Sequence, residues 1–211
     1  MMPLTILITG FGPFPGAPFN PTETLVRRLA RVRRPALADV RLVPHVFVTS
    51  YAAVDRDLPS LIRKHKPDAI LMFGLAARTP FLRIETSARN AVAAIADAER
   101  HAPTMQAIAR DRPGRLALRT PARRLLSGAR AARAPAALSR DAGRYLCNYL
   151  CWQATEAAQA KDGPRLAAVV HVPLVRRAPL PVSRMRKKAV TMTVLTRAGG
   201  EFLRVIASAA R

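Results

Sequence analysis

The chain has 211 residues, a length typical of one domain, and half of its residues are hydrophobic. It carries 35 Lys and Arg against 13 Asp and Glu, which gives a formal net charge of +22. The apolar content suffices for a sizeable core and excludes a disordered basic tail. Most of the positive charge is Arg, in a chain also rich in Ala and Pro. We therefore weigh a GC-rich coding bias equally with a functional origin of the charge.

The two cysteines, Cys147 and Cys151, are too few for a disulfide framework, and they lie four residues apart on one predicted helix. This pattern favours a reducing compartment. The first residues lack the basic and long apolar regions of a secretory signal, and no apolar run reaches the length of a membrane span. We expect a cytoplasmic protein that makes no contact with membranes.

Short apolar runs alternate with amphipathic stretches along the first half of the chain. Asn20 and Pro21 have the residue types of a helix N-cap and first turn, and they follow a loop rich in Gly and Pro. Buried strands are predicted at 4–9, 41–48 and 69–73, and helices at 20–32 and 50–65.

The second half repeats the alternation after a less regular region at 85–115. Strands are predicted at 115–118, 136–138 and 166–172, and helices at 121–133 and about 143–160. A proline-rich basic stretch at 173–188 precedes a last amphipathic helix.

This order of elements predicts an α/β fold with three α/β/α layers around a mainly parallel twisted sheet. No repeat or linker divides residues 1–211, so we expect a single domain. Sites in such sheets lie at the carboxyl ends of the strands, here the segments after Thr9, Phe73, Leu138 and Val170.

Three of these segments lead to side chains that suit nucleophilic catalysis. Cys147 lies in the first turns of the helix after Leu138, where the helix dipole favours a thiolate, as do the neighbouring Arg140 and Arg144. His171 ends the strand 166–172. Glu85 follows the strand 69–73 after a loop. A thiolate, an imidazole and an orienting carboxylate form a cysteine-nucleophile triad. Taken singly, each residue is more often explained as part of the core or the surface.

Four segments, in order over about residues 6–173, resemble the pyroglutamyl-peptidase I (pyrrolidone-carboxylate peptidase) family of cysteine peptidases. Residues 9–16 with Asn20-Pro21-Thr22 resemble its loop Thr-Gly-Phe-x-Pro-Phe-Gly-Gly and Asn-Pro-Ser. Residues 74–78, with Glu85 eleven residues after Gly74, resemble its Gly-x-Ala-Gly-Gly-Arg block and catalytic Glu. Residues 139–148 resemble Ser-x-x-Ala-Gly-x-x-x-Cys-Asn, and 171–173 resemble its His-Ile-Pro.

The resemblance implies the removal of N-terminal pyroglutamyl residues from peptides through a thioester, without a metal or a cofactor. It assigns Cys147 as nucleophile, His171 as acid and base, and Glu85 as the residue that orients the imidazole. Backbone amides of the loop before Cys147 would supply an oxyanion hole. The substrate-binding residues implied are Phe11, Phe14, Leu75, Tyr145, Leu146 and His45.

Three departures from the family pattern put the rate and the specificity in question. Ile95 stands where the family has an Arg close to the catalytic centre, and Arg89 or Arg100 is the nearest candidate to replace it. Ala76-Ala77 replaces a flexible Gly pair. His45 stands where bacterial relatives often have Thr near the pocket.

Two alternatives stay open on the sequence alone. One is a related binding protein with impaired or altered catalysis. The other is a basic nucleic-acid-binding protein. Its candidate patch lacks interleaved aromatic residues and any known nucleic-acid motif, so we expect no specific nucleic-acid partner. That patch consists of Arg176, Arg177, Arg184, Arg186, Lys187 and Lys188. Cys151 is expected to pack in the core, and a homodimer or homotetramer is compatible with the apolar last helix.

Overall fold

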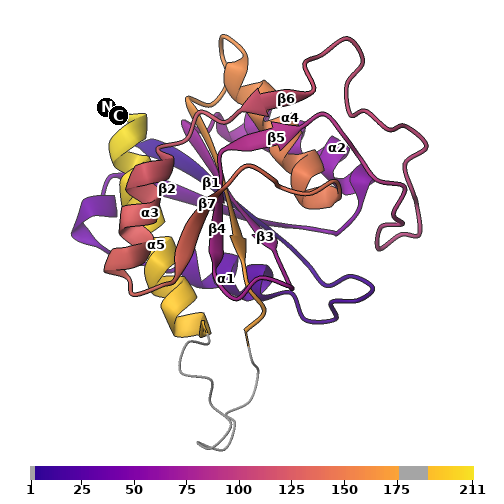
Figure 1. Cartoon of the computed structure of the whole chain (residues 1–211). Helices are drawn as coiled ribbons and strands as arrows, with labels where there is room; N and C mark the ends of the chain where they lie inside the picture. Colours follow the sequence, from indigo (N-terminus) through magenta and orange to yellow (C-terminus); the bar gives the residue numbers. More distant parts are fainter. Residues whose placement is uncertain (1–2, 176–189) are drawn as a thin grey trace, which may run out of the picture.

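A computed structural model describes residues 3–175 and 190–211, and Figure 1 shows a central sheet with helices on both sides. The sheet has six strands in the order β2-β1-β3-β8-β4-β7. They are β1 (Leu4–Phe11), β2 (Val40–Phe47), β3 (Ala69–Leu75), β4 (Leu82–Glu85), β7 (Ala136–Ser139) and β8 (Leu166–Val172). Two short strands, β5 (Ser87–Arg89) and β6 (Arg115–Ala117), form a separate antiparallel ribbon.

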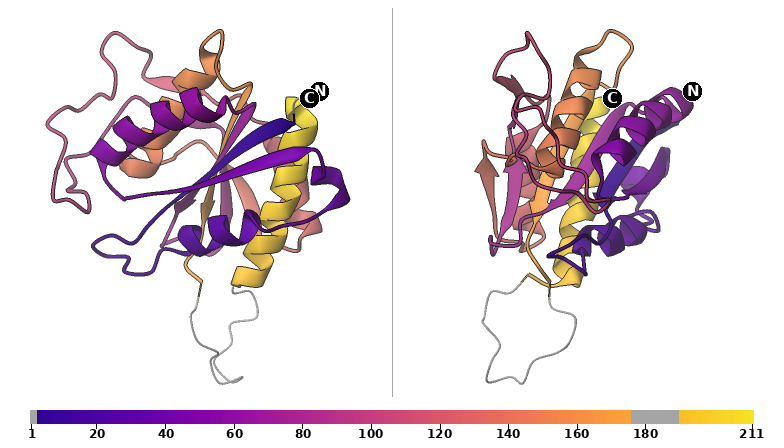
Figure 2. Two further views of the ribbon diagram at one scale, coloured as in Figure 1. Left: turned by 180° about the vertical axis from the view of Figure 1, so that it is seen from behind. Right: turned by 90° about the vertical axis from the view of Figure 1, so that its right-hand side faces the viewer.

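The helices cover the two faces of the sheet. They are α1 (Pro21–Leu29), α2 (Tyr51–His65), α3 (Ala122–Ala131), α4 (Leu146–Gln159) and α5 (Met192–Ala210), with a short 3₁₀ turn η1 (Pro35–Leu37). Helices α1, α3 and α5 pack on one face, and α2 and α4 pack on the other (Figures 1 and 2). The expected three-layer α/β/α fold is therefore confirmed.

The central strands are apolar on both faces, because each residue in turn faces one helical layer and then the other. Leu71 and Val170 belong to the core under α1, α3 and α5. Their neighbours Met72 and Val169 belong to the core under α2 and α4. This alternation decides on which face any functional side chain of β3, β4 or β8 lies.

Two strands run against the rest of the sheet. β1, β2, β3 and β8 are parallel, whereas β4 pairs antiparallel with β8 and parallel with β7. The sequence predicts that the segment after Leu138 leaves the sheet at the same edge as the segments after Thr9 and Phe73. This prediction is therefore wrong. β7 points the other way, and the loop 140–145 runs back to bring α4 toward the end of β8.

Other differences from the predicted elements are local. β4 was not foreseen, and it turns Glu85 from a loop residue into the last residue of a strand. α4 begins at Leu146, three residues later than expected. The basic stretch 176–188, including the candidate nucleic-acid patch, lies outside the described residues. Among the residues that the structure describes, no helix is both long enough and apolar enough to cross a membrane.

The central position of β3 predicts a large effect of truncating its core side chains. Leu71 is fully buried, and Leu71→Ala should lower the free energy of unfolding by about 2–5 kcal/mol through lost burial and an unfilled cavity. Urea unfolding measures this change. Leu138→Ala, at a position 43% exposed, is the control and should change stability by no more than about 0.5 kcal/mol. Equal losses in both variants would contradict this account of the core.

Candidate active site

The three triad candidates come from different elements but meet on the α4 face of the sheet. His171 of β8 pairs with Arg83 of β4, and Glu85 lies two residues further along that strand. Since residues opposite one another and residues two apart point to the same face, Glu85 and His171 share the face of Val169. That face is covered by α4, whose second residue is Cys147.

Glu85 and His171 are in direct contact. The Nδ1 atom of His171 lies 2.8 Å from Oε1 of Glu85, and the side chains of Glu85 and His171 are 0% and 5% exposed. A carboxylate on Nδ1 fixes the tautomer of the ring and leaves Nε2 for a second partner. The imidazole is thus oriented by a buried group, as a catalytic base requires.

Gly74 shows how the thiol reaches the ring. Gly74 on β3 pairs with His171 on β8, so a side chain at this position would point toward α4. A Cβ atom on Gly74 would lie 2.8 Å from Sγ of Cys147 and 3.0 Å from Nε2 of His171. The thiol and the imidazole therefore occupy the space that any other residue would fill, and the thiol lies on the Nε2 side of the ring, close enough to raise the pKa of His171.

The charges of this cluster support one another. Burial alone lowers the pKa of His171, but its hydrogen bonds to Cys147 and Glu85 outweigh burial and raise the pKa to about 9. For Glu85, burial raises the pKa, and the contacts with His171, Ser139 and Arg83 more than reverse that effect, so the pKa is lowered. The stable pair at neutral pH is an imidazolium beside a carboxylate.

The loop between β7 and α4 carries the thiol into place. Gly143 has φ of +84°, a conformation that residues with a side chain rarely adopt. The backbone N–H of Asp141 donates to Oε2 of Glu85 (3.2 Å), and that of Gly143 donates to Oδ1 of Asp141 (2.9 Å). Tyr145, the N-cap of α4, caps no N–H group with its side chain. The first N–H groups of α4 around Cys147 thus stay available to a ligand.

The second cysteine has a different setting. Cys151 is fully buried one turn further along α4, and burial raises the pKa of its thiol. Cys147 is half-buried. Arg140 and Arg144 are exposed, and their contacts with Ser87, Arg115 and Ala93 run through their own backbone carbonyl oxygens.

The expected substrate-binding residues divide into two groups. Phe14 and Tyr145 are half-buried, and their ring centroids lie 6.2 Å apart beside the start of α4. Leu75 is half-buried at the end of β3. Phe11 and Leu146 are 2% and 1% exposed, so both are mainly core residues under α2 and α4.

His45 makes its contacts with α2 and with its own strand β2. Its Nε2 atom lies 3.5 Å from Oδ2 of Asp57, and its ring packs edge-on against Phe47. Burial lowers the pKa of His45, which leaves the ring mostly neutral at pH 7. Its contacts give it a packing role between β2 and α2.

The segment 93–98 forms a wall beside the start of α4. Ala93 donates its N–H to the carbonyl of Arg144, and the Tyr145 hydroxyl donates to the carbonyl of Ala96 (3.1 Å). Ile95, where the family has an Arg, is 52% exposed in this wall. Of the two suggested replacements, Arg89 lies 3.4 Å from Asp141 of the Cys147 loop, whereas Arg100 is exposed.

Three positions have a role at the site that the sequence alone did not assign to them. Gly74 makes room for the thiol, and Arg83 lies 3.2 Å from Glu85. Asn148 is fully buried and bonds the backbone of Arg89 and Ala91, which ties the segment that precedes the wall to α4. The position of Arg83, two residues before Glu85, is a usable signal once β4 is recognised as a strand.

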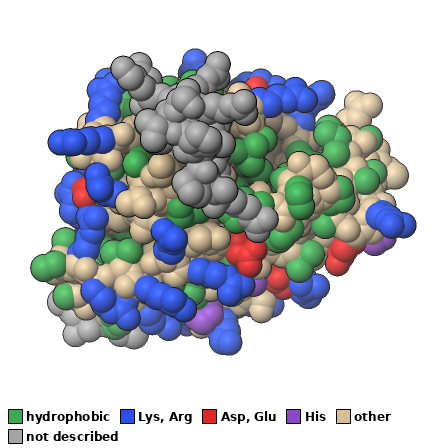
Figure 3. Space-filling model, turned by 90° about the horizontal axis from the view of Figure 1, so that it is seen from below, with side chains coloured by type: hydrophobic (Ala, Val, Ile, Leu, Met, Phe, Trp, Pro, Cys, Tyr) green, Lys and Arg blue, Asp and Glu red, His purple; other side chains and the backbone are tan. Residues whose placement is uncertain are grey.

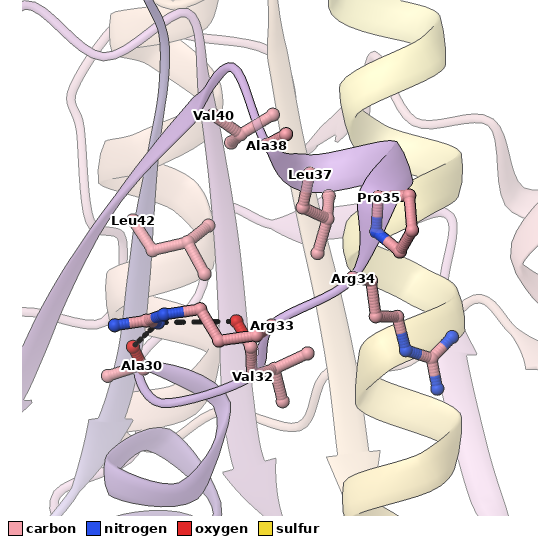
Figure 4. Close-up of a pocket in the computed structure, with 9 residues that line it drawn as sticks. All are labelled: Ala30, Val32, Arg33, Arg34, Pro35, Leu37, Ala38, Val40 and Leu42. Carbon is pink, nitrogen blue, oxygen red and sulfur yellow. Dashed lines mark hydrogen bonds between the residues drawn. The ribbon is translucent and has the colours of Figure 1, made fainter.

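Two other features lie apart from this chemistry. A cavity of about 650 Å³ between α1, η1 and β2 is lined by apolar residues with Arg33 and Arg34, and Arg34 turns from it toward α5 (Figure 4). Asp97, Glu99 and His101 hold possible ligand atoms within 4.8 Å of one another. Both oxygens of Asp97 already accept backbone N–H groups, so the cluster is explained as a turn that also caps α2.

Comparison with known proteins agrees with this geometry. The model of the pyroglutamyl peptidase family matches residues 4–196. The chain belongs to this family. It is 30% identical over 173 residues to the pyrrolidone-carboxylate peptidase of Thermococcus onnurineus, which covers 82% of this chain and 84% of the relative. The Bacillus subtilis pyrrolidone-carboxylate peptidase is 31% identical over 172 residues, or 81% and 78% of the two chains.

The structural comparison extends over nearly the whole chain. The pyrrolidone carboxyl peptidase from Thermococcus litoralis superimposes with a TM-score of 0.85 at 25% identity, covering 96% of this chain and 92% of that one. Family membership identifies a cysteine peptidase of the pyroglutamyl type and favours it over the two alternative functions.

In the face seen in Figure 3, Lys and Arg side chains are spread out rather than gathered in one patch.

The close approach at Gly74 predicts a severe effect of a single methyl group. Gly74→Ala places a Cβ atom 2.8 Å from both Sγ of Cys147 and Cδ2 of His171, so the thiol and the ring must move apart. Displacement of a reacting group by about 1 Å can lower a rate about 100-fold, so we expect the reactivity of the Cys147 thiol to fall by about that factor. The rate of thiol alkylation by iodoacetamide measures it without reference to a substrate.

A matched control exists for this substitution. Gly114 has no heavy atom within 4 Å of an added Cβ and no positive φ, so Gly114→Ala should react like the wild type. A Gly74→Ala thiol as reactive as the wild-type thiol would show that the space around Gly74 does not limit the site.

The raised pKa of His171 also predicts how stability depends on pH. A group whose pKa is raised by folding contributes stability in full below its unfolded value of 6.5, and that contribution is lost as the pH rises through about 9. The free energy of unfolding should therefore fall between pH 6.5 and 9. When stability is measured by urea unfolding, His171→Gln should not show this part of the decline with pH. An identical dependence of the free energy of unfolding on pH in both proteins would contradict the raised pKa of His171.

Proposed function

We propose that this chain, as one domain, hydrolyses the amide bond that follows an N-terminal pyroglutamyl residue of a peptide. The observation that carries the proposal is the buried 2.8 Å contact of His171 with Glu85, with the Cys147 thiol on the other side of the same ring. Support for the substrate class comes from membership of the pyroglutamyl peptidase family.

In the first step, Sγ of Cys147 attacks the carbonyl carbon of the pyroglutamyl residue, while the proton that Sγ shares with His171 is held on Nε2 of the ring. The C–N bond to the next residue breaks, and Nε2 of His171 passes a proton to the leaving amine. Glu85 stabilises the imidazolium throughout, because its carboxylate stays on Nδ1. A pyroglutamyl thioester remains on Cys147.

In the second step, a water molecule attacks the thioester while His171 accepts its proton. The C–S bond then breaks, pyroglutamate leaves and the thiol–imidazole pair is restored. Backbone N–H groups at the start of α4 are suited to stabilise the oxyanion of both steps, since they carry the positive end of the helix dipole.

The lactam ring of pyroglutamate is flat and uncharged, which suits an aromatic pocket. Phe14 and Tyr145 are the best placed of the sequence-derived candidates, because both are half-buried beside the thiol helix. Leu75 would contact the ring from β3, and Phe11 and Leu146 would support the pocket from the core. His45 contributes indirectly through Phe47. A cytoplasmic location and a homodimer or homotetramer remain part of the proposal.

The two cysteines provide the decisive experiment. Cys147→Ala should lower the hydrolysis of a fluorogenic pyroglutamyl amide by at least about 1,000-fold, because no nucleophile remains at His171. Cys151→Ala should retain most of the activity, because its thiol is buried and protonated. Steady-state kcat/KM measures both.

Two controls separate this activity from its alternatives. An alanyl amide reporter has a charged amino group where pyroglutamate has a neutral ring, and it should not be cleaved. Equal rates for wild type and Cys147→Ala would exclude the assigned nucleophile. An inactive wild type with a thiol inert to alkylation would favour the binding-protein alternative.

A further inference from the structure

Arg83 places a positive charge on the outer side of the catalytic carboxylate. Its Nη2 atom lies 3.2 Å from Oε1 of Glu85, the same oxygen that contacts Nδ1 of His171. The Arg83 side chain is 25% exposed, whereas that of Glu85 is 0% exposed. Antiparallel pairing explains the position, since Arg83 stands opposite His171 on the same face of the sheet.

Arg83 is also fixed by uncharged partners. Its Nη2 and Nε atoms donate to Oγ of Ser139, at 2.9 and 3.3 Å, and Nη2 also donates to the carbonyl of Asp141. The N–H of the same Asp141 donates to Oε2 of Glu85. The guanidinium thus joins β4, β7 and the loop that leads to Cys147.

The charges at the site balance only when Arg83 is counted. When Sγ of Cys147 reacts as an anion, its charge, the imidazolium of His171 and the carboxylate of Glu85 sum to one negative charge. A net charge in a buried cluster is costly, because the surroundings solvate it poorly. The guanidinium brings the sum to zero, at a distance where opposite charges interact strongly.

We propose that Arg83 is a positioning residue that keeps Glu85 ionised and directed at His171, and so helps to keep the Cys147 thiol reactive in mildly acidic conditions. This deepens the proposed function, on which it rests for its link to catalysis. Arg83 touches neither the thiol nor the expected place of the substrate, so it acts through Glu85.

The other ionisable groups around Glu85 do not replace this charge. His171 faces it from β8, and the thiol of Cys151 lies near it on α4. Asp141 in the loop above is acidic, and its carboxylate is already paired with Arg89 of β5 at 3.4 Å. Among the described residues whose contacts involve Glu85, Arg83 is the one permanent cation.

Arg115 offers a matched control. Its Nη1 atom donates to the carbonyl of Arg140 and to Oγ of Ser87, so it anchors the same loop with the same chemical group. Within the described residues, it forms no hydrogen bond or ion pair with Glu85. Arg115→Met therefore removes a loop anchor, whereas Arg83→Met removes a loop anchor and the charge beside the carboxylate.

The test is the pH dependence of Cys147 alkylation, followed from pH 5 to 9 on the full chain. Loss of a nearby cation disfavours the negatively charged forms of Glu85 and of the Cys147 thiol. In Arg83→Met, the acid limb of the profile, where the alkylation rate falls as the pH decreases, should therefore move to higher pH by about 1 unit. Arg83→Lys retains the charge and should stay close to the wild type. Arg115→Met should leave the limb in place. In parallel, the acid limb of kcat/KM for the pyroglutamyl amide should shift with little change in KM.

Each outcome decides the proposal. A lower rate in Arg83→Met with an unshifted acid limb would mean that Arg83 only anchors the loop, and it would overturn the proposal. So would an equal shift in Arg115→Met. If circular dichroism shows that Arg83→Met does not fold, Arg83→Lys provides the test. A shifted acid limb in Arg83→Lys, which keeps the positive charge, would contradict a role for that charge. If the alkylation profile shifts but no pyroglutamyl amide is cleaved, the inference about Arg83 stands and the proposed function fails.

Discussion

The contact between Glu85 and His171 is the constraint on which the rest of the site depends. A carboxylate with no exposed surface is stable only if cations and N–H groups surround it. The imidazolium, the Arg83 guanidinium and the N–H of Asp141 meet this need from three different segments. The burial of one charge therefore fixes the reversed strand β4, the loop before α4 and the orientation of the ring together.

The sequence was sufficient for the layers of the fold and for the three chemically capable side chains. Runs such as 69–73 and 166–172 are apolar on both faces, and this pattern indicates central strands regardless of their neighbours. The helix start at Asn20-Pro21 follows from local hydrogen bonding, which the structure shows as an Asn20 side chain accepting from Thr22.

What the sequence did not reveal depends on pairing between distant segments. β4 is only four residues long and carries Arg83 and Glu85, so its composition does not resemble that of a buried strand. Its direction is set by pairing with β8, more than 80 residues away in the chain. The role of Arg83 follows from this register and that of Gly74 from the pairing of β3 with β8, and a local pattern therefore cannot show them.

The separation of these partners in the chain has a consequence for folding. Glu85 and His171 are 86 residues apart, and the strands that carry them run in opposite directions at the centre of the sheet. Their contact closes a long loop, and loop closure of this kind slows folding. A reactive thiol at Cys147 thus requires both halves of the chain. During refolding, the recovery of thiol reactivity reports the packing of the two halves against each other rather than the folding of either half alone.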